Sequence, residues 1–202
     1  LRPAVVHLKR SFSSRNGMPD DLNNPQSYTE QSFAAMGKLP QHASSFSLQY
    51  LEAPLLLHLL LLEGKAGLAS RICETAKPGS AQLILNYIEK DLNSQTKIKG
   101  ATQPVMGNTL LTLLTDASEI RRKMGDSFIS IEHIVLAAVK ATGATSAAFK
   151  EHGVTYKALE EATLQIRGGP DRKITSRNPE VSYEALSKYA RDLTAAAADG
   201  KL

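Results

Sequence analysis

The histidines and the single cysteine are the side chains of this sequence best suited to metal binding or nucleophilic chemistry. The five histidines do not recur at metal-ligand spacing around Cys73; they are His7, His42, His58, His133 and His152. A zinc site needs three or four convergent ligands, so we predict no metal site. Cys73 reads as a packed or partly exposed thiol. His58 lies within a run of leucines and reads as a core or groove residue rather than a catalytic base.

The glycine-containing loops do not supply a nucleotide site. ATP hydrolysis requires the phosphate-cradling loop G-x-x-x-x-G-K-[ST] together with an acid that holds the metal. Gly64-Lys65-Ala66-Gly67 and the stretch 100–107 lack that spacing. We therefore predict that these 202 residues are not an enzyme and bind no cofactor.

The formal net charge of +4 comes from one end of the chain. Residues 1–17 hold four Lys or Arg and no acid, while the rest balances 20 basic against 20 acidic residues. A nucleic-acid-binding domain carries its basic residues on a folded face, and 5% aromatic content without Trp argues against base-stacking platforms. The apolar run 55–62 is too short for a bilayer core, which needs about 20 residues. We predict neither a nucleic-acid nor a membrane partner.

The first 17 residues are basic, Ser-containing and acid-free, which is the composition of an organelle transit peptide. Arg10-Ser11-Phe12-Ser13-Ser14 resembles a mitochondrial processing site. We predict a mitochondrial matrix location. A plastid-like organelle and the cytoplasm remain alternatives, the last if the segment is only a disordered basic tail. One cysteine fits a reducing compartment.

An internal duplication with a constant offset of 80 residues organises the remainder. Thr29 matches Thr109, and Leu51-Glu52 matches Ile131-Glu132. Apolar residues recur at three- and four-residue intervals, which is the spacing of helices. The predicted helices are 29–39, 53–63, 68–75 and 80–92 in the first copy and 108–124, 131–140, 146–151 and 156–166 in the second.

The second helix of each copy is apolar on nearly every face, which places it at the domain centre. The fold class predicted is all-α: a pseudo-two-fold helical bundle. The bundle spans 24–168, with one repeat at 28–96 and the other at 105–168. Gly168-Gly169-Pro170 ends the last helix, residues 169–180 read as a linker, and 181–202 begin a new helix.

Two stretches resemble a known family. Gly125-Asp126-Ser127-Phe128-Ile129-Ser130-Ile131-Glu132-His133-Ile134 is similar to the Clp N-terminal (Clp repeat) domain. The tail from Ile174 to Leu202, with Asn178-Pro179-Glu180 and Tyr183-Glu184-Ala185-Leu186, resembles the entry into the first AAA+ ATPase module of ClpB-type disaggregases. The likeness covers roughly residues 24–202.

The resemblance implies an accessory domain of a hexameric, ATP- and Mg-dependent stress chaperone that refolds proteins. Such domains engage unfolded or aggregated polypeptides, or an adaptor or co-chaperone, before threading. The alternative is a standalone Clp-repeat adaptor that docks on a Clp chaperone or protease. Because the ring contacts belong to the ATPase modules, we expect the fragment itself to be monomeric.

The same resemblance implies polypeptide-binding residues. Thr29, Asp126 and Glu132 match positions that flank a shallow apolar groove in ClpB-type members, and all three residue types agree. The alternative is that they only cap helices, since Thr suits an N-cap and an acid suits a first turn. Pro54 and Lys38-Leu39-Pro40 depart from the family pattern. We expect the second helix to begin near Ala53 and the first to be shortened.

Overall fold

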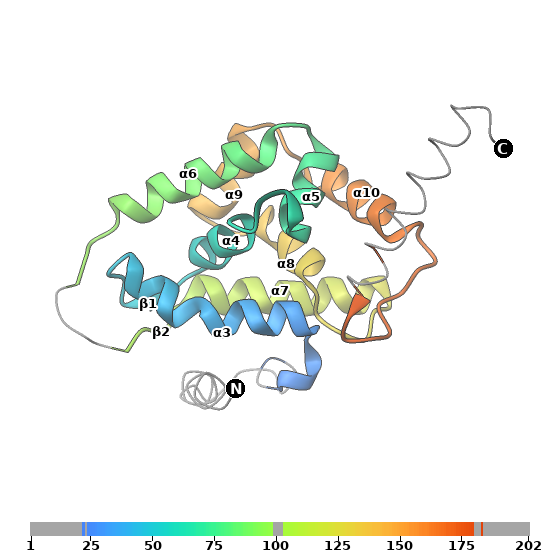
Figure 1. Cartoon of the computed structure of the whole chain (residues 1–202), viewed down its shortest axis with the longest axis horizontal. Helices are drawn as coiled ribbons and strands as arrows, with labels where there is room; N and C mark the ends of the chain where they lie inside the picture. Colours follow the sequence, from blue (N-terminus) through green and yellow to red (C-terminus); the bar gives the residue numbers. More distant parts are fainter. Residues whose placement is uncertain (1–21, 23, 99–102, 180–182, 184–202) are drawn as a thin grey trace.

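Two apolar helices lie in the middle of the fold, as the sequence predicted. They are α4 (Ala53–Leu61) and α8 (Ile131–Ala138) in the computed structural model, which describes residues 22, 24–98, 103–179 and 183 (Figure 1). All residues of α8 are buried, and in α4 Leu59 alone is not. A helix that is apolar all round has no side to turn toward water, so both helices are wrapped by the others.

The remaining helices surround this centre, and the all-α class is confirmed. Figure 1 shows α3 (Glu30–Ser45) and α7 (Asn108–Met124) below α4 and α8, and α6 (Ser80–Ser94) and α9 (Ala144–Glu151) above. Helices α5 (Leu68–Ala76) and α10 (Tyr156–Arg167) pack against each other. Short 3-10 turns occupy Pro25–Ser27 and Gly64–Ala66.

The expected shortening of the first helix is wrong. Helix α3 continues through Pro40 to Ser45. A proline inside a helix removes one backbone hydrogen bond and crowds the carbonyl four residues earlier. Packing overrides this cost, because Met36, Leu39 and Ala43 are 1%, 2% and 0% exposed on the same side of the helix. The expected start of α4 at Ala53 is confirmed, with Pro54 tolerated in its first turn.

The offset between the two copies is not constant at 80 residues: it is 78 at the starts of the first two helices of each copy and 76 at the starts of α5 and α9 and of α6 and α10. The N-caps of α3 and α7 are Thr29 and Gly107, and those of α4 and α8 are Glu52 and Ser130. The buried residues of α3 and α7 follow the same shift: Ser32, Ala35, Met36 and Leu39 against Leu110, Leu113, Leu114 and Ala117. The offset of 80 came from matching similar residues in the two copies, whereas the helices begin where the buried positions require.

Short parallel pairings join the two copies where their helices begin. Strands β1 (Tyr50–Leu51) and β2 (Val105–Met106) pair in parallel, with Leu51 opposite Met106. An isolated parallel bridge joins Tyr28 to Ile129. With the 78-residue offset these two pairings are equivalent, so they obey the pseudo-two-fold relation that the helices show.

The chain beyond α10 also contacts the bundle. Gly168 takes a left-handed conformation (φ 87°) and ends α10, as predicted. Within the predicted linker 169–180, residues 172–177 are hydrogen-bonded to the domain. The predicted transit peptide 1–17 and, apart from Tyr183, the predicted helix 181–202 lie outside the described residues. Within the described ranges, no helix has the length and apolar character needed to cross a membrane.

A substitution at Gly107 tests the contact between the start of α7 in the second copy and Glu52 in the first. A Cβ atom at this position would lie 2.1 Å from the carboxyl carbon of Glu52, whose carboxylate accepts a hydrogen bond from the N–H of Thr109 at 2.9 Å. Gly107→Ala therefore displaces that carboxylate, and we expect the free energy of unfolding to fall by about 1–3 kcal/mol in urea titrations. In the background Glu52→Ala the same substitution costs less. Equal losses in both backgrounds would contradict this account.

Candidate functional site

The site begins with a tight turn at the end of α7. Gly125 adopts a left-handed conformation (φ 72°), and its N–H and that of Asp126 donate to the carbonyls of Arg122 and Arg121. A left-handed glycine followed by such bonds is a common way to end a helix. The turn directs Asp126 inward, toward the start of α8.

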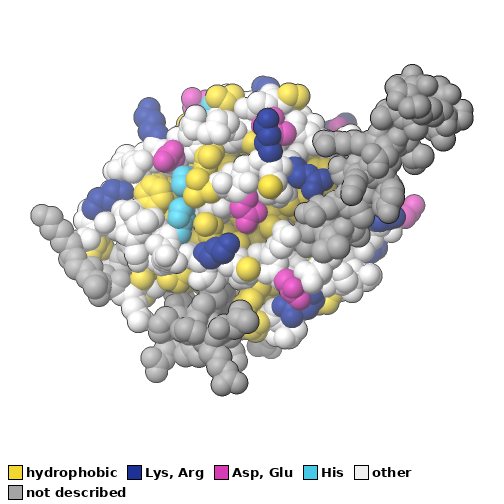
Figure 2. Space-filling model, viewed as in Figure 1, with side chains coloured by type: hydrophobic (Ala, Val, Ile, Leu, Met, Phe, Trp, Pro, Cys, Tyr) yellow, Lys and Arg dark blue, Asp and Glu magenta, His cyan; other side chains and the backbone are white. Residues whose placement is uncertain are grey.

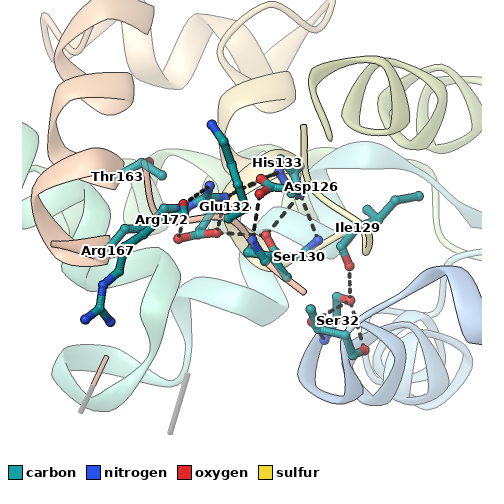
Figure 3. A network of polar contacts seen from close by, with 12 residues as sticks. Ser32, Asp126, Ile129, Ser130, Glu132, His133, Thr163, Arg167 and Arg172 are labelled. Carbon is teal, nitrogen blue, oxygen red and sulfur yellow. Dashed lines mark hydrogen bonds and ion pairs between the residues drawn. The ribbon is translucent and has the colours of Figure 1, made fainter. Parts of the chain in front are cut away.

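Arg167, the last residue of α10, forms a buried ion-pair network with four other side chains (Figure 3). Its guanidinium makes a two-pronged contact with Glu132, Nε to Oε1 at 3.0 Å and Nη2 to Oε2 at 2.7 Å. Nη2 also donates to Asp126 Oδ2 at 2.7 Å. Ser130 Oγ donates to Glu132 Oε2 at 3.0 Å. His133 completes the buried ion-pair network. Forked contacts between Arg and a carboxylate are among the stronger hydrogen bonds of proteins.

His133 links the helix cap to this network. The N–H of Ser130 donates to His133 Nδ1 at 2.9 Å, so the ring proton sits on Nε2 and is donated to Asp126 Oδ2 at 2.8 Å. Ser130 and His133 thus form the reciprocal capping box at the start of α8, with His in the place usually taken by Glu or Gln. The helix cap and the buried carboxylate are held by one ring.

The charges of the network stabilise one another despite burial. Burial alone would raise the pKa of Asp126, but hydrogen bonds from His133, Arg167 and the N–H of Ile174, together with the charge of Arg167, hold that pKa below its ordinary value. Burial alone would lower the pKa of Arg167, but Glu132 and Asp126 raise it further above its usual range. The guanidinium and the Asp126 carboxylate are therefore both charged at neutral pH.

Thr29 lies apart from the network, at the start of α3. Its Oγ1 accepts the N–H of Ser32 at 3.3 Å, and Ser32 Oγ donates to the carbonyl of Ile129 at 2.7 Å (Figure 3). The N–H of Thr29 also donates to that carbonyl, at 3.0 Å. Through Ile129, the residue before Ser130, the cap of α3 is joined to the cap of α8.

The structure thus brings Asp126 and Glu132 together on Arg167 and connects Thr29 to them through the backbone. Asp126 is 5% exposed, and Glu132 and Thr29 are both 0% exposed. The expected helix-start roles are present: Thr29 caps α3, and Glu132 occupies the first turn of α8. Direct contact of these side chains with a polypeptide stays a prediction.

Sequence reasoning missed Arg167, the centre of the network. In the sequence it is one cation at the end of a helix before two glycines, and such residues usually face solvent. It is 1% exposed. The sequence indicated a buried cation only indirectly. Asp126, Glu132 and His133 are three ionisable residues in a stretch whose apolar periodicity predicts burial. Buried charges need a partner.

A partly buried histidine pair lies between α3 and α4. His42 Nε2 and His58 Nδ1 are 2.9 Å apart with the rings stacked, and Phe46 meets both rings edge-on at 5.3 Å. His58 is 2% exposed. Burial, followed by the charge of His42, lowers the pKa of His58 to about 4. His58 is therefore neutral at pH 7 and is a core residue, as predicted.

Cys73 is buried in helix α5. Cys73 is 0% exposed, and burial, followed by Glu74, raises the pKa of its thiol to about 12, so it is a packed thiol. Among the residues that the structure describes, no three His, Cys, Asp or Glu side chains converge on a point that could hold a metal ion.

Comparison with known families and proteins gives one answer. The Clp repeat (R) N-terminal domain family matches residues 27–152. Chaperone protein ClpB 1 of Thermosynechococcus vestitus is 39% identical over 180 residues, which is 89% of this chain and 20% of that protein. Chaperone protein ClpB3, chloroplastic, of Arabidopsis thaliana is 33% identical over 202 residues, again 20% of its length. The chain thus spans about a fifth of these curated relatives.

Solved structures agree on the fold. The Hsp104 N-terminal domain from Candida albicans superposes with a TM-score of 0.65 at 16% identity, covering 76% of this chain and 98% of that one. The N-domain of ClpV from Vibrio cholerae gives a TM-score of 0.61 at 13% identity, covering 75% of this chain and 92% of that one. At such identities the likeness concerns the fold alone.

The buried ion-pair network predicts a large stability loss when its cation is removed. Arg167→Met leaves the carboxylates of Asp126 and Glu132 buried without their partner, and we expect the free energy of unfolding at pH 7 to fall by about 3–5 kcal/mol. The matched control is Lys157→Ala, which breaks an exposed pair with Glu161 at 3.8 Å and should cost less than about 0.5 kcal/mol. Similar losses in the two variants, measured by urea denaturation, would refute the assignment.

The lowered pKa of His58 predicts a stability that depends on pH. Its ordinary pKa of 6.5 applies to the unfolded chain, so between pH 6.5 and about 4 the unfolded state binds a proton that the folded state does not. The free energy of unfolding should therefore fall as the pH is lowered through this window, by on the order of 2 kcal/mol. In His58→Leu the decline should be smaller. An unchanged slope in that variant would show that other groups cause it.

Proposed function

Because the chain belongs to the Clp repeat (R) N-terminal domain family, we propose that it is the polypeptide-binding accessory domain of a ClpB-type, ATP-dependent protein disaggregase. The relatives named above are ClpB chaperones, and the matched part is about a fifth of their length. No ATPase module is evident in this chain, and its sequence contains no phosphate-binding loop of the G-x-x-x-x-G-K-[ST] type. Its part in the proposed function is to engage unfolded or aggregated proteins, and catalysis belongs to the ATPase modules of such a chaperone.

The observation that carries this proposal is an apolar surface on a domain whose core is already complete. Figure 2 shows hydrophobic side chains gathered along the middle of one face, around histidine side chains. Leu59 is the one α4 residue that is not buried, and Leu62, one turn later, is 52% exposed. Residues three apart on a helix share a face. Phe46 is half-buried beside His42 and His58.

Apolar surface of this kind suits clients without a fixed sequence. The hydrophobic effect is non-directional and follows the area removed from water, at about 25 cal/mol per Å². The net charge beyond residue 17 is zero, so this part of the chain has no excess charge with which to attract clients of one sign. We therefore attribute the binding to apolar contact. Ordering an unfolded client offsets part of the gain, so we expect weak binding that many polypeptides share.

The residues carried over from the family lie at the helix starts rather than on this apolar surface. We propose that Thr29, Asp126 and Glu132 shape a polar margin that a bound polypeptide meets through its backbone. Support comes from Thr29 at the cap of α3 and Glu132 in the first turn of α8. Asp126 lies in the turn after α7, and its carboxylate accepts a main-chain N–H, that of Ile174, at 2.7 Å.

We also propose that residues 1–17 direct the protein to an organelle, with the mitochondrial matrix as the location. Their basic, acid-free composition supports the targeting role. A plastid-like organelle is the alternative, and relatives from Arabidopsis thaliana and rice that carry "chloroplastic" in their names support it.

Leu62 gives the direct test of polypeptide binding. Leu62→Gln removes apolar contact area without disturbing the core, and we expect the affinity for reduced, carboxymethylated α-lactalbumin, a permanently unfolded protein, to fall about fivefold by fluorescence anisotropy. Leu83→Gln on α6 is the matched control, because Leu83 is similarly exposed at 49%. It should bind like the wild type. No binding by the wild-type chain, or equal losses in both variants, would overturn the proposal.

A further inference from the structure

A segment of the chain's own backbone that is neither helix nor strand covers the start of α3 and the turn before α8, close to the residues that we assign to polypeptide binding. This docked segment comprises residues 172–177. Its Ile174 N–H donates to Asp126 Oδ1 at 2.7 Å, and its Ile174 carbonyl accepts the N–H of Ser127 at 2.8 Å. Three residues later, the carbonyl of Arg177 accepts the N–H of Glu30, the first residue of α3, at 2.8 Å. The segment therefore spans from the buried ion-pair network to α3.

Two side chains anchor the docked segment. Ile174 is 1% exposed although it lies outside the contiguous apolar core of the domain. The guanidinium of Arg177 donates to the carbonyls of Tyr28 and Pro25, at 3.1 and 3.3 Å, and to Gln26 Oε1 at 3.0 Å. The anchors are a buried aliphatic side chain and, three residues later, an arginine held by three carbonyl oxygens.

The remaining contacts use groups that any polypeptide has. The domain offers one carboxylate oxygen, two main-chain N–H groups and one N–H of the Arg167 guanidinium, and the segment answers with one N–H and three carbonyls of its main chain. Recognition through the main chain of an extended segment, with pockets for a few side chains, is a recurrent way of binding peptides. An incoming strand with the same anchors can make every one of these bonds.

We propose that the docked segment is an intramolecular competitor: it occupies an extended-polypeptide site that prefers an aliphatic residue followed three positions later by arginine. The inference rests on the proposed function, which supplies the incoming polypeptide. It explains why Asp126 is buried here, since one of its oxygens is already taken by Ile174. A client reaches this site when the docked segment leaves.

The competition has a measurable consequence. A site that is open for only a fraction of the time binds its ligand more weakly by that fraction. Loosening the docked segment without altering the domain surface must therefore tighten the binding of an external polypeptide. Arg177 is the residue to change, because its side chain makes three contacts with the domain and belongs only to the segment.

The first experiment compares two substitutions in the full 202-residue chain. We expect Arg177→Ala to bind reduced, carboxymethylated α-lactalbumin about three- to tenfold more tightly than the wild type does. Arg172→Ala is the matched control: it removes the same charge from the same segment, but only the carbonyl of Arg172 contacts the domain, at 3.4 Å from Arg167 Nη1. It should leave the affinity unchanged. Amide hydrogen exchange at Ile174 verifies that Arg177→Ala has released the segment.

The second experiment supplies the segment in trans. A labelled peptide with the sequence of residues 171–179 should bind the released variant Ile174→Asn/Arg177→Ala and bind the wild type at least tenfold more weakly. A peptide of the same composition in scrambled order should bind neither. Circular dichroism establishes that the variants keep their helices.

The outcomes separate this inference from the proposed function. Tighter binding by Arg177→Ala, with trans peptide bound by the released variant, supports the inference. If the released variant binds the peptide but no form of the chain binds the unfolded protein, the site is correct and the proposed function fails. Equal affinities of the wild type and Arg177→Ala for the unfolded protein, with Ile174 released, overturn the inference and leave the proposed function standing.

Discussion

The contact between Arg167 and its two carboxylates is the interaction on which the rest of the structure depends. Arg167 ends α10, Glu132 begins α8, and Asp126 lies in the loop after α7, so a single guanidinium fixes three elements. Asp126 carries the constraint further, because its second oxygen holds Ile174. A charge so deeply buried is tolerable only with all its partners in place. Loss of this one guanidinium therefore affects contacts in all three elements at once.

The start of α4 in the first repeat is held by different contacts from those at the start of α8 in the second. Glu52 stands where Ser130 stands in the second repeat, and its carboxylate accepts hydrogen bonds from the N–H and hydroxyl of Thr109. Pro54 occupies the position equivalent to Glu132, so no acid is available there for an arginine. The pseudo-two-fold symmetry thus holds for backbone and burial but not for charge. Among the residues that the structure describes, the buried ion-pair network is found at the corner of the second repeat and has no counterpart at the corner of the first.

The sequence predicted the helices well because their apolar periodicity is strong, and it placed α4 and α8 at the centre because each is apolar all round. It failed where a contact distant in the sequence decides the outcome. Pro40 stays inside α3 because Leu39 and Ala43 are buried against other helices, and no local rule contains that information. Arg167 lies 35 residues from Glu132, and a lone cation at a helix end reads as solvated. The likeness to a family pointed to Asp126 and Glu132, and the structure supplied what holds them.

We propose that the domain presents a polypeptide-binding site at the start of α3 and the turn before α8, and that its own docked segment covers that site. Amide hydrogen exchange of the full chain, resolved by residue, tests this most directly. We predict that the amides of Glu30, Ser127 and Ile174 are all protected in the free chain, because each donates a hydrogen bond across this site. On saturation with a permanently unfolded protein, Ile174 should lose its protection while Glu30 and Ser127 keep theirs. Rapid exchange of Ile174 in the free chain, or unchanged protection on saturation, would contradict the claim.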